Sequence, residues 1–214
     1  MTDRQPGTII LLNGSASSGK TSIANAIKRL AEEPYLHLGI DVFWERVFPH
    51  EWVGASQNTW NHVPVEGSDP PKSAVVFTPF GLSFTSGLHH TVAALSRIGH
   101  NVVVDHVLTD ALQVRSCVET WRGLPVLSVG VRCPLHATLG RASTRVAERW
   151  PEYIEAVAWQ HGEVHMHTRA LYDLEVDTSC LGPDECAQTI LGYLREHRAR
   201  DGFERLATEV LDKR

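Results

Sequence analysis

The stretch GSASSGKT, residues 14–21, constrains this chain most, because it places small residues between a strand pattern and a helix pattern. It follows the apolar, β-branched run GTIILLN (7–13) and precedes SIANAIKRLAEE (22–33), where isoleucine and leucine recur at helical spacing. It matches G-x-x-x-x-G-K-[ST] at every position. Backbone N–H groups of such a loop turn toward a phosphate, and the positive end of the following helix points to the same place. The sequence therefore predicts a phosphate-binding loop in the first βα unit.

Two side chains of this loop can act on a bound nucleotide. Lys20 can reach the β- and γ-phosphates, and the Thr21 hydroxyl can ligate Mg²⁺. A second acid is expected at the end of another strand, and Asp105 follows the apolar run at 102–104; the alternative is an aspartate that caps a turn. We predict ATP and Mg²⁺ as cofactors, with Thr21 and Asp105 as metal ligands. The predicted nucleotide-binding residues of the loop are Gly14, Ser15, Ala16, Ser17, Ser18, Gly19, Lys20, Thr21 and Ser22.

Strand and helix patterns alternate along the rest of the chain, which predicts an α/β three-layer sandwich: a parallel five-stranded sheet with helices on both faces. Residues 42–80 have weak periodicity and receive no assignment. We expect one kinase-type domain over 1–200, with a lid at about 134–170 and a C-terminal tail at 201–214 that is either a short helix or mobile. Predicted strands are 7–13, 35–40, 100–108, 124–133 and 172–179, and predicted helices are 22–33, 87–99, 111–123, 183–199 and a broken helical region at 134–170.

Composition excludes several classes of protein. The 214 residues carry a formal net charge of -5 without a long Lys/Arg block, which argues against a nucleic-acid partner. No apolar run reaches the roughly 18 residues of a membrane span, and the polar start is unlike a signal peptide. The four cysteines lack CxxC spacing and are interpreted as reduced thiols. We expect a cytoplasmic protein, and the sequence leaves a homo-oligomer open.

Asp41 follows the predicted strand 35–40, at the carboxyl edge where ligands bind in open α/β sheets. A carboxylate there can take the proton of a substrate hydroxyl that attacks the γ-phosphorus. The same residue is also a good N-cap for a helix that starts at Val42. Spacing alone does not separate these two interpretations.

Three further groups of residues invite functional interpretations. Arg141, Arg145 and Arg149 recur every four residues; a lid can use such arginines to neutralise a transferring phosphoryl group, although a solvated basic face is the simpler reading for any one of them. His161 and His165 are spaced as i and i+4, which invites a metal site, but a clear third ligand is lacking, so these two and His167 are interpreted as surface or lid histidines. Trp44, Trp52 and Trp60, with Phe43 and Phe48, can line a pocket for a flat substrate or form core under a long loop.

With these residues in view, the chain resembles the chloramphenicol phosphotransferase family of small P-loop kinases. The resemblance spans nearly all of 7–180 and is carried by IILLNGSASSGKTSI, LGID, VVVDHV, VGVRC, LGRASTR and YDLEVDTS. It implies Asp41 as catalytic base, Lys20 as a catalytic phosphate-binding residue and Arg141 and Arg145 as lid arginines. It also implies that the VDTS stretch, with Asp177 and Thr178, lies near the nucleotide base.

The chain departs from that family in two places. The third strand ends in Asp105-His106 where the family has two acids, and residues 49–85, which should shape the acceptor pocket, show little similarity. The resemblance thus implies ATP-dependent transfer of a phosphoryl group to a hydroxyl of a small molecule, an antibiotic such as chloramphenicol or a related compound, and hence antibiotic resistance. A metabolic kinase of a sugar, nucleoside or biosynthetic intermediate, a non-catalytic nucleotide switch and a nucleic-acid end kinase are the alternatives.

Overall fold

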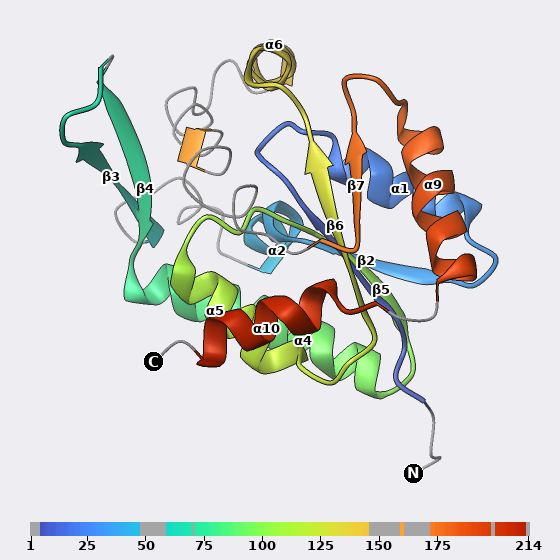
Figure 1. Cartoon of the computed structure of the whole chain (residues 1–214). Coiled ribbons are helices and arrows are strands. Elements are labelled where there is room, and N and C mark those ends of the chain that lie inside the picture. Colours follow the sequence, from blue (N-terminus) through green and yellow to red (C-terminus); the bar gives the residue numbers. More distant parts are fainter. Residues whose placement is uncertain are drawn as a thin grey trace.

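Five parallel strands form the centre of the computed structural model, as predicted (Figure 1). The structure describes residues 5–47, 59–69, 71–145, 159–160, 172–197 and 200–212. The strand order is β2-β5-β1-β6-β7, so the chain leaves β1 toward one edge of the sheet and returns later to build the other. The strands are β1 (Ile9–Asn13), β2 (Tyr35–Gly39), β5 (Asn101–His106), β6 (Val126–Arg132) and β7 (Leu174–Asp177).

Helices cover both faces of this sheet. On one face, α1 and α9 pack over Ile10, Leu12 and Val103; on the other, α4, α5 and α10 pack over Ile9, Leu11 and neighbouring residues (Figure 1). Alternate residues of the central strands therefore enter different cores, as expected of a sheet buried on both sides. The helices of these two layers are α1 (Lys20–Leu30), α9 (Pro183–Glu196), α4 (Pro79–Arg97), α5 (Ala111–Trp121) and α10 (Gly202–Asp212).

The segment expected to be a tail forms α10, and its Phe203 side chain is buried against Trp121 of α5.

Helix α4 begins at Pro79, eight residues before the predicted start at 87. Thr78 caps it by accepting a hydrogen bond from Gly81 N at 3.1 Å. Within the part of the chain that the structure describes, no helix combines the length and apolarity needed to cross a membrane.

Four further elements occupy the region of weak periodicity and the start of the expected lid. β3 and β4 form an antiparallel hairpin apart from the main sheet (Figure 1). Most of β3 is exposed, which explains its weak sequence pattern. Of the predicted helical lid at 134–170, the structure describes residues 134–145, which include α6, and residues 159–160; the other lid residues lie outside the described ranges. The three elements before the lid and α6 itself are α2 (Ile40–Val47), β3 (Trp60–Val65), β4 (Lys72–Phe77) and α6 (Leu135–Arg145).

Two histidines are buried together between α4, α5 and β5. The Nε2 atoms of His89 and His106 lie 3.1 Å apart, and Nδ1 of His89 lies 3.0 Å from the Ser116 hydroxyl. Burial lowers the pKa of His106 to about 4, and burial together with the neighbouring His106 lowers that of His89 as well. Both imidazoles are therefore neutral at pH 7, and one donates its Nε2 proton to the other.

Because the pKa of His106 falls from 6.5 to about 4 on folding, the unfolded chain takes up this proton first as the pH falls. As the pH is lowered from 6.5 to 4, the free energy of unfolding of the unmodified protein should fall. That of His106→Gln should fall less, and the two losses should differ by up to about 3 kcal/mol, the value for one proton. Urea unfolding at several pH values measures this difference, with the exposed His136→Gln as control. Parallel curves for parent and His106→Gln would contradict it.

Gly39 is required by the packing of β2 on β5. It pairs in register with Asp105, and a Cβ at Gly39 would lie 1.9 Å from Asp105 Oδ1. We expect Gly39→Ala to lower the free energy of unfolding by about 1–3 kcal/mol, as overpacking does. Gly192→Ala in α9 is the control, because its Cβ would meet nothing within 4 Å and should be neutral or stabilising. Equal denaturation midpoints for parent and Gly39→Ala would show that the carboxylate moves aside at no cost.

Candidate functional site

The phosphate-loop motif joins β1 to α1 at the carboxyl edge of the sheet. Ser17 and Gly19 have positive φ values of 58° and 96°, and Gly19 directly precedes the first residue of α1. A Cβ at Gly14 would lie 2.6 Å from the Val131 carbonyl oxygen, so only glycine fits there. The loop therefore curls tightly at the helix N-terminus, an arrangement suited to bind an anion.

Lys20, at the start of α1, is buried under this loop. Its Nζ donates a hydrogen bond to the Ser15 carbonyl oxygen at 2.7 Å. Burial lowers the pKa of Lys20, while the charges of Asp105 and Asp41 oppose that shift. The Ser18 hydroxyl is also buried, and the described residues offer it no hydrogen-bond partner. A buried cation and an unsatisfied hydroxyl beside a curled loop fit the phosphates of a nucleotide.

Asp105 lies at the carboxyl end of β5 and meets the start of α1. The Thr21 hydroxyl donates to Asp105 Oδ2 at 2.6 Å. Burial raises the pKa of Asp105, but the nearby His37, the hydrogen bond from Thr21 and the charge of Lys20 outweigh it, so the pKa is lowered. The group is therefore a carboxylate at neutral pH. A hydroxyl and a carboxylate are oxygen donors of the kind that Mg²⁺ prefers, so the predicted pair fits that ion.

Asp41 lies in the first turn of α2, one residue after the helix begins at Ile40. The helix starts two residues earlier than the capping alternative required, which places Asp41 inside the helix. Its side chain is exposed, and its charge acts on Lys20. A carboxylate close to the buried cation yet open to solvent can contact both a phosphate donor and an incoming hydroxyl.

Arg141 connects α6 to the loop after β7. Its guanidinium donates to the Thr178 hydroxyl at 3.0 Å and to the Thr178 carbonyl oxygen at 2.7 Å. The Thr178 hydroxyl in turn donates to the Ser18 carbonyl oxygen at 2.8 Å. Arg145 belongs to the same helix, and its side chain lies outside what the structure describes. The structure thus brings the first predicted lid arginine and Thr178 against the phosphate loop.

These contacts border a cavity of about 230 Å³ beside the loop. Asp177 is not among the residues that line it. Asp177 Oδ1 accepts hydrogen bonds from the backbone N–H and hydroxyl of Ser179. Those two bonds lower the pKa of Asp177 and fix the turn. The cavity is lined by Ser17, Gly19, Ser22, Ile23, Arg141, Thr178, Leu181 and Pro183.

Aromatic side chains gather beside Asp41. The ring of Trp44 lies 4.3 Å from that of Phe84 and meets Trp60 edge-on at 6.0 Å. Trp60 is buried with Val75, and Ala16 of the phosphate loop packs against this pair. The open end of the β3–β4 hairpin, where Trp60 pairs with Phe77, therefore contacts the phosphate loop. Trp52 and Phe48 fall outside the described residues, as do His161, His165 and His167.

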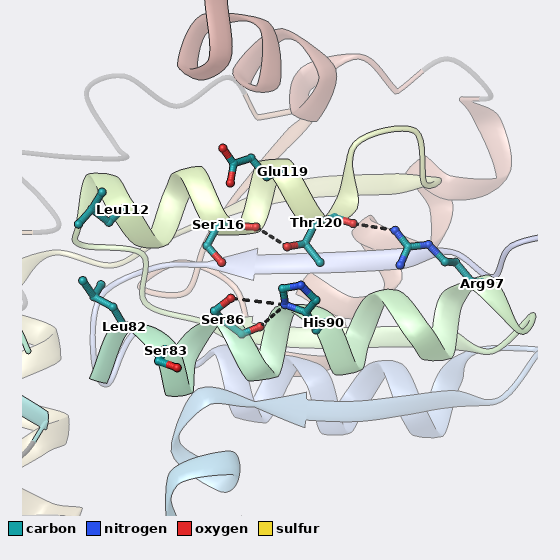
Figure 2. Close-up of a pocket in the computed structure, with 9 residues that line it drawn as sticks. All are labelled: Leu82, Ser83, Ser86, His90, Arg97, Leu112, Ser116, Glu119 and Thr120. Atoms are coloured by element: carbon teal, nitrogen blue, oxygen red, sulfur yellow. Dashed lines mark hydrogen bonds between the residues drawn. The ribbon is translucent and has the colours of Figure 1, made fainter. Parts of the chain in front are cut away.

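A second, larger groove lies elsewhere, between α4 and α5 (Figure 2). Its volume is about 490 Å³, and none of the predicted site residues lines it. Arg97 crosses one end, where its Nη2 donates to the Thr120 carbonyl oxygen at 3.1 Å. His90 is held within its own helix by the Ser86 carbonyl oxygen, at 2.9 Å. The chemistry of the phosphate loop has no counterpart in this groove.

Sequence reasoning missed three residues that shape the site. His37 of β2 approaches Asp105, and Asn13 Oδ1 accepts a hydrogen bond from Leu108 N at 3.1 Å. Gln160 accepts from Val75 N at 2.9 Å and donates to Val75 O at 3.0 Å, which ties it to the hairpin. Only Asn13 carried a signal, since a polar residue ends an apolar strand just before the motif.

Comparisons with known proteins bear on the family and the fold of this chain. A protein of Mycobacterium tuberculosis named "Putative O-phosphotransferase Rv2636" is 29% identical over 195 residues, which cover 89% of this chain and 83% of that protein. The Mycobacterium tuberculosis APS kinase CysC superposes with a TM-score of 0.59 at 18% identity, covering 89% of this chain and 99% of that one. Shikimate kinase from Acinetobacter baumannii gives 0.56 at 15% identity, covering 91% and 96%. These two structures share the P-loop kinase fold with this chain.

The model of one family matches residues 7–195, which include the phosphate loop, Asp41, Asp105 and Arg141. This match spans most of the chain and agrees with the resemblance found in the sequence. The chain belongs to the chloramphenicol phosphotransferase-like family and has the fold of a P-loop small-molecule O-phosphotransferase.

Proposed function

We propose that this protein transfers the γ-phosphoryl group of ATP to a hydroxyl of a small molecule. The observation that carries the proposal is the convergence of Lys20, Thr21, Asp105 and Asp41 beside one curled phosphate loop. Phosphoryl transfer requires mainly positioning and neutralisation of charge, and these residues supply both.

Each residue has a distinct role in the proposed reaction. Asp41 accepts the proton of the acceptor hydroxyl, whose oxygen bonds to the γ-phosphorus while the bond from that phosphorus to the β–γ bridging oxygen breaks and ADP leaves. Lys20 turns from the Ser15 carbonyl to the phosphates. Thr21 and Asp105 would hold Mg²⁺, which supplies further positive charge at the phosphates when bound.

The acceptor is proposed to be an antibiotic with a ring and a free hydroxyl, such as chloramphenicol or a related compound. Family membership supports this choice, and so do Trp44 and Phe84, which offer aromatic faces near Asp41. The direct test is a panel of hydroxylated antibiotics, sugars, nucleosides and biosynthetic intermediates with labelled ATP, followed by mass detection of product. Phosphorylation of a metabolite alone would favour a metabolic kinase, and ATP hydrolysis indifferent to every acceptor would favour a nucleotide switch.

The charge of Asp41 is tested by Asp41→Asn, which keeps the size of the side chain. We expect phosphotransfer to fall by about 10²–10⁴-fold, the usual contribution of a general base, with ATP affinity retained. Steady-state transfer to the best acceptor of the panel measures this, beside a thermal melt. The exposed Asp212→Asn in α10 is the matched control. A normal rate for Asp41→Asn would leave the mechanism without its base.

The contact of Arg141 with Thr178 changes the role expected of it. We propose that Arg141 holds the nucleotide in the cavity beside the loop, so Arg141→Ala should raise the KM for ATP by about 10-fold or more, as loss of charged hydrogen bonds does, with a smaller effect on kcat. Initial rates over a range of ATP concentrations measure both constants. Arg115→Ala, which removes an exposed ion pair on α5, is the control. If kcat falls while KM holds, Arg141 acts on the transferring group, as the sequence suggested.

A further inference from the structure

His37 lies in the middle of β2 and faces the predicted metal-binding carboxylate. Its Nε2 is 3.4 Å from Asp105 Oδ2, and both side chains are nearly buried, at 9% and 6% exposure. No predicted role of the site uses this histidine. The question is what a nearly buried histidine does so close to the proposed metal-binding carboxylate.

The register of the sheet explains why the two side chains meet. His37 pairs with Val103 and Gly39 with Asp105, so all four lie on the same face of neighbouring parallel strands. Gly39 has no side chain, and Asp105 Oδ1 occupies the space where its Cβ would be. The carboxylate therefore lies across Gly39 and reaches back toward His37.

The two oxygens of Asp105 have different surroundings. Oδ1 is held against Gly39, whereas Oδ2 receives the Thr21 hydroxyl at 2.6 Å and faces His37 at 3.4 Å. The histidine contact is longer than the 2.7–3.2 Å of a well-formed hydrogen bond, and it does not meet hydrogen-bond geometry. A small rotation of either side chain would shorten it, so the N–H of His37 is a second donor within reach of an oxygen that already accepts from the Thr21 hydroxyl.

We infer that His37 is a positioning residue for Asp105: it holds the carboxylate in the orientation that ligates Mg²⁺ beside Thr21. This inference rests on the proposed nucleotide and Mg²⁺ binding. Residues that bond to a metal-binding carboxylate fix its direction, and their loss commonly costs 10–100-fold in metal affinity. Thr21 alone cannot fix the carboxylate as firmly, because its own oxygen is a proposed ligand of the same ion.

The test measures binding, separately from turnover. Calorimetry gives the Kd of Mg²⁺ for the complex of the protein with a non-hydrolysable ATP analogue, and the Kd of the analogue itself in EDTA. His37→Leu removes the donor at similar volume, so the Kd of Mg²⁺ should rise about 10-fold or more while metal-free nucleotide affinity stays within about twofold. His37→Gln restores an N–H donor and should recover part of the loss. His100→Leu, the same change at an exposed histidine just before β5, is the control.

Three outcomes for the variants overturn the inference, and one for the parent protein does so as well. His37→Leu could bind Mg²⁺ as the parent does, or His37→Gln could be as weak as His37→Leu. A parallel fall in melting temperature, nucleotide affinity and Mg²⁺ affinity would make His37 a packing residue only. A parent that binds Mg²⁺ and the analogue but phosphorylates no acceptor refutes the proposed function and leaves the His37 comparison intact. A parent that binds neither refutes both.

Discussion

The hydrogen bond from Thr21 to Asp105 joins the two halves of the site. Thr21 is fixed by the start of α1 and Asp105 by the end of β5, so the bond depends on the parallel pairing of β1 with β5. That pairing brings Asn13 and His106 side by side, and Asn13 then accepts a hydrogen bond from the backbone beyond β5. Any shift in register would separate the phosphate loop from the acid, because each residue along a strand moves the side chains by more than 3 Å and to the other face.

The positive charge of buried Lys20 has two acidic side chains near it. A buried ammonium is costly unless acids lie near it, and Lys20 has Asp105 and Asp41 as such neighbours. One of the two acids is buried and the other exposed. This asymmetry suits the proposed roles, in which the buried carboxylate stays at the phosphates and the exposed one contacts the acceptor.

Much of this arrangement could be read from the sequence, because parallel strands buried on both faces appear as continuous apolar runs and the phosphate loop has a fixed spacing. The hairpin could not be read, since β3 is mostly exposed and contains Pro64, which argues against a strand. The start of α4 was obscured by Gly81, which is needed because a Cβ there would lie 2.1 Å from the Thr59 carbonyl oxygen. His37 carried no signal, because its role depends on which strand lies beside β2 and in what register.

The packing of Ala16 against the cluster of Trp60 and Val75 has a thermodynamic consequence. The hairpin beside Asp41 and the loop that would hold the phosphates share one apolar contact, so neither can shift without changing the surface that the other presents. Gln160, bonded to both backbone groups of Val75, extends that dependence to the chain beyond α6. Binding free energies linked in this way are reciprocal. If a bound nucleotide raises the affinity for the acceptor by some factor, a bound acceptor raises the affinity for the nucleotide by the same factor. A chain built like this can favour the complex in which both substrates are present over either one alone, and so limit the loss of ATP to water.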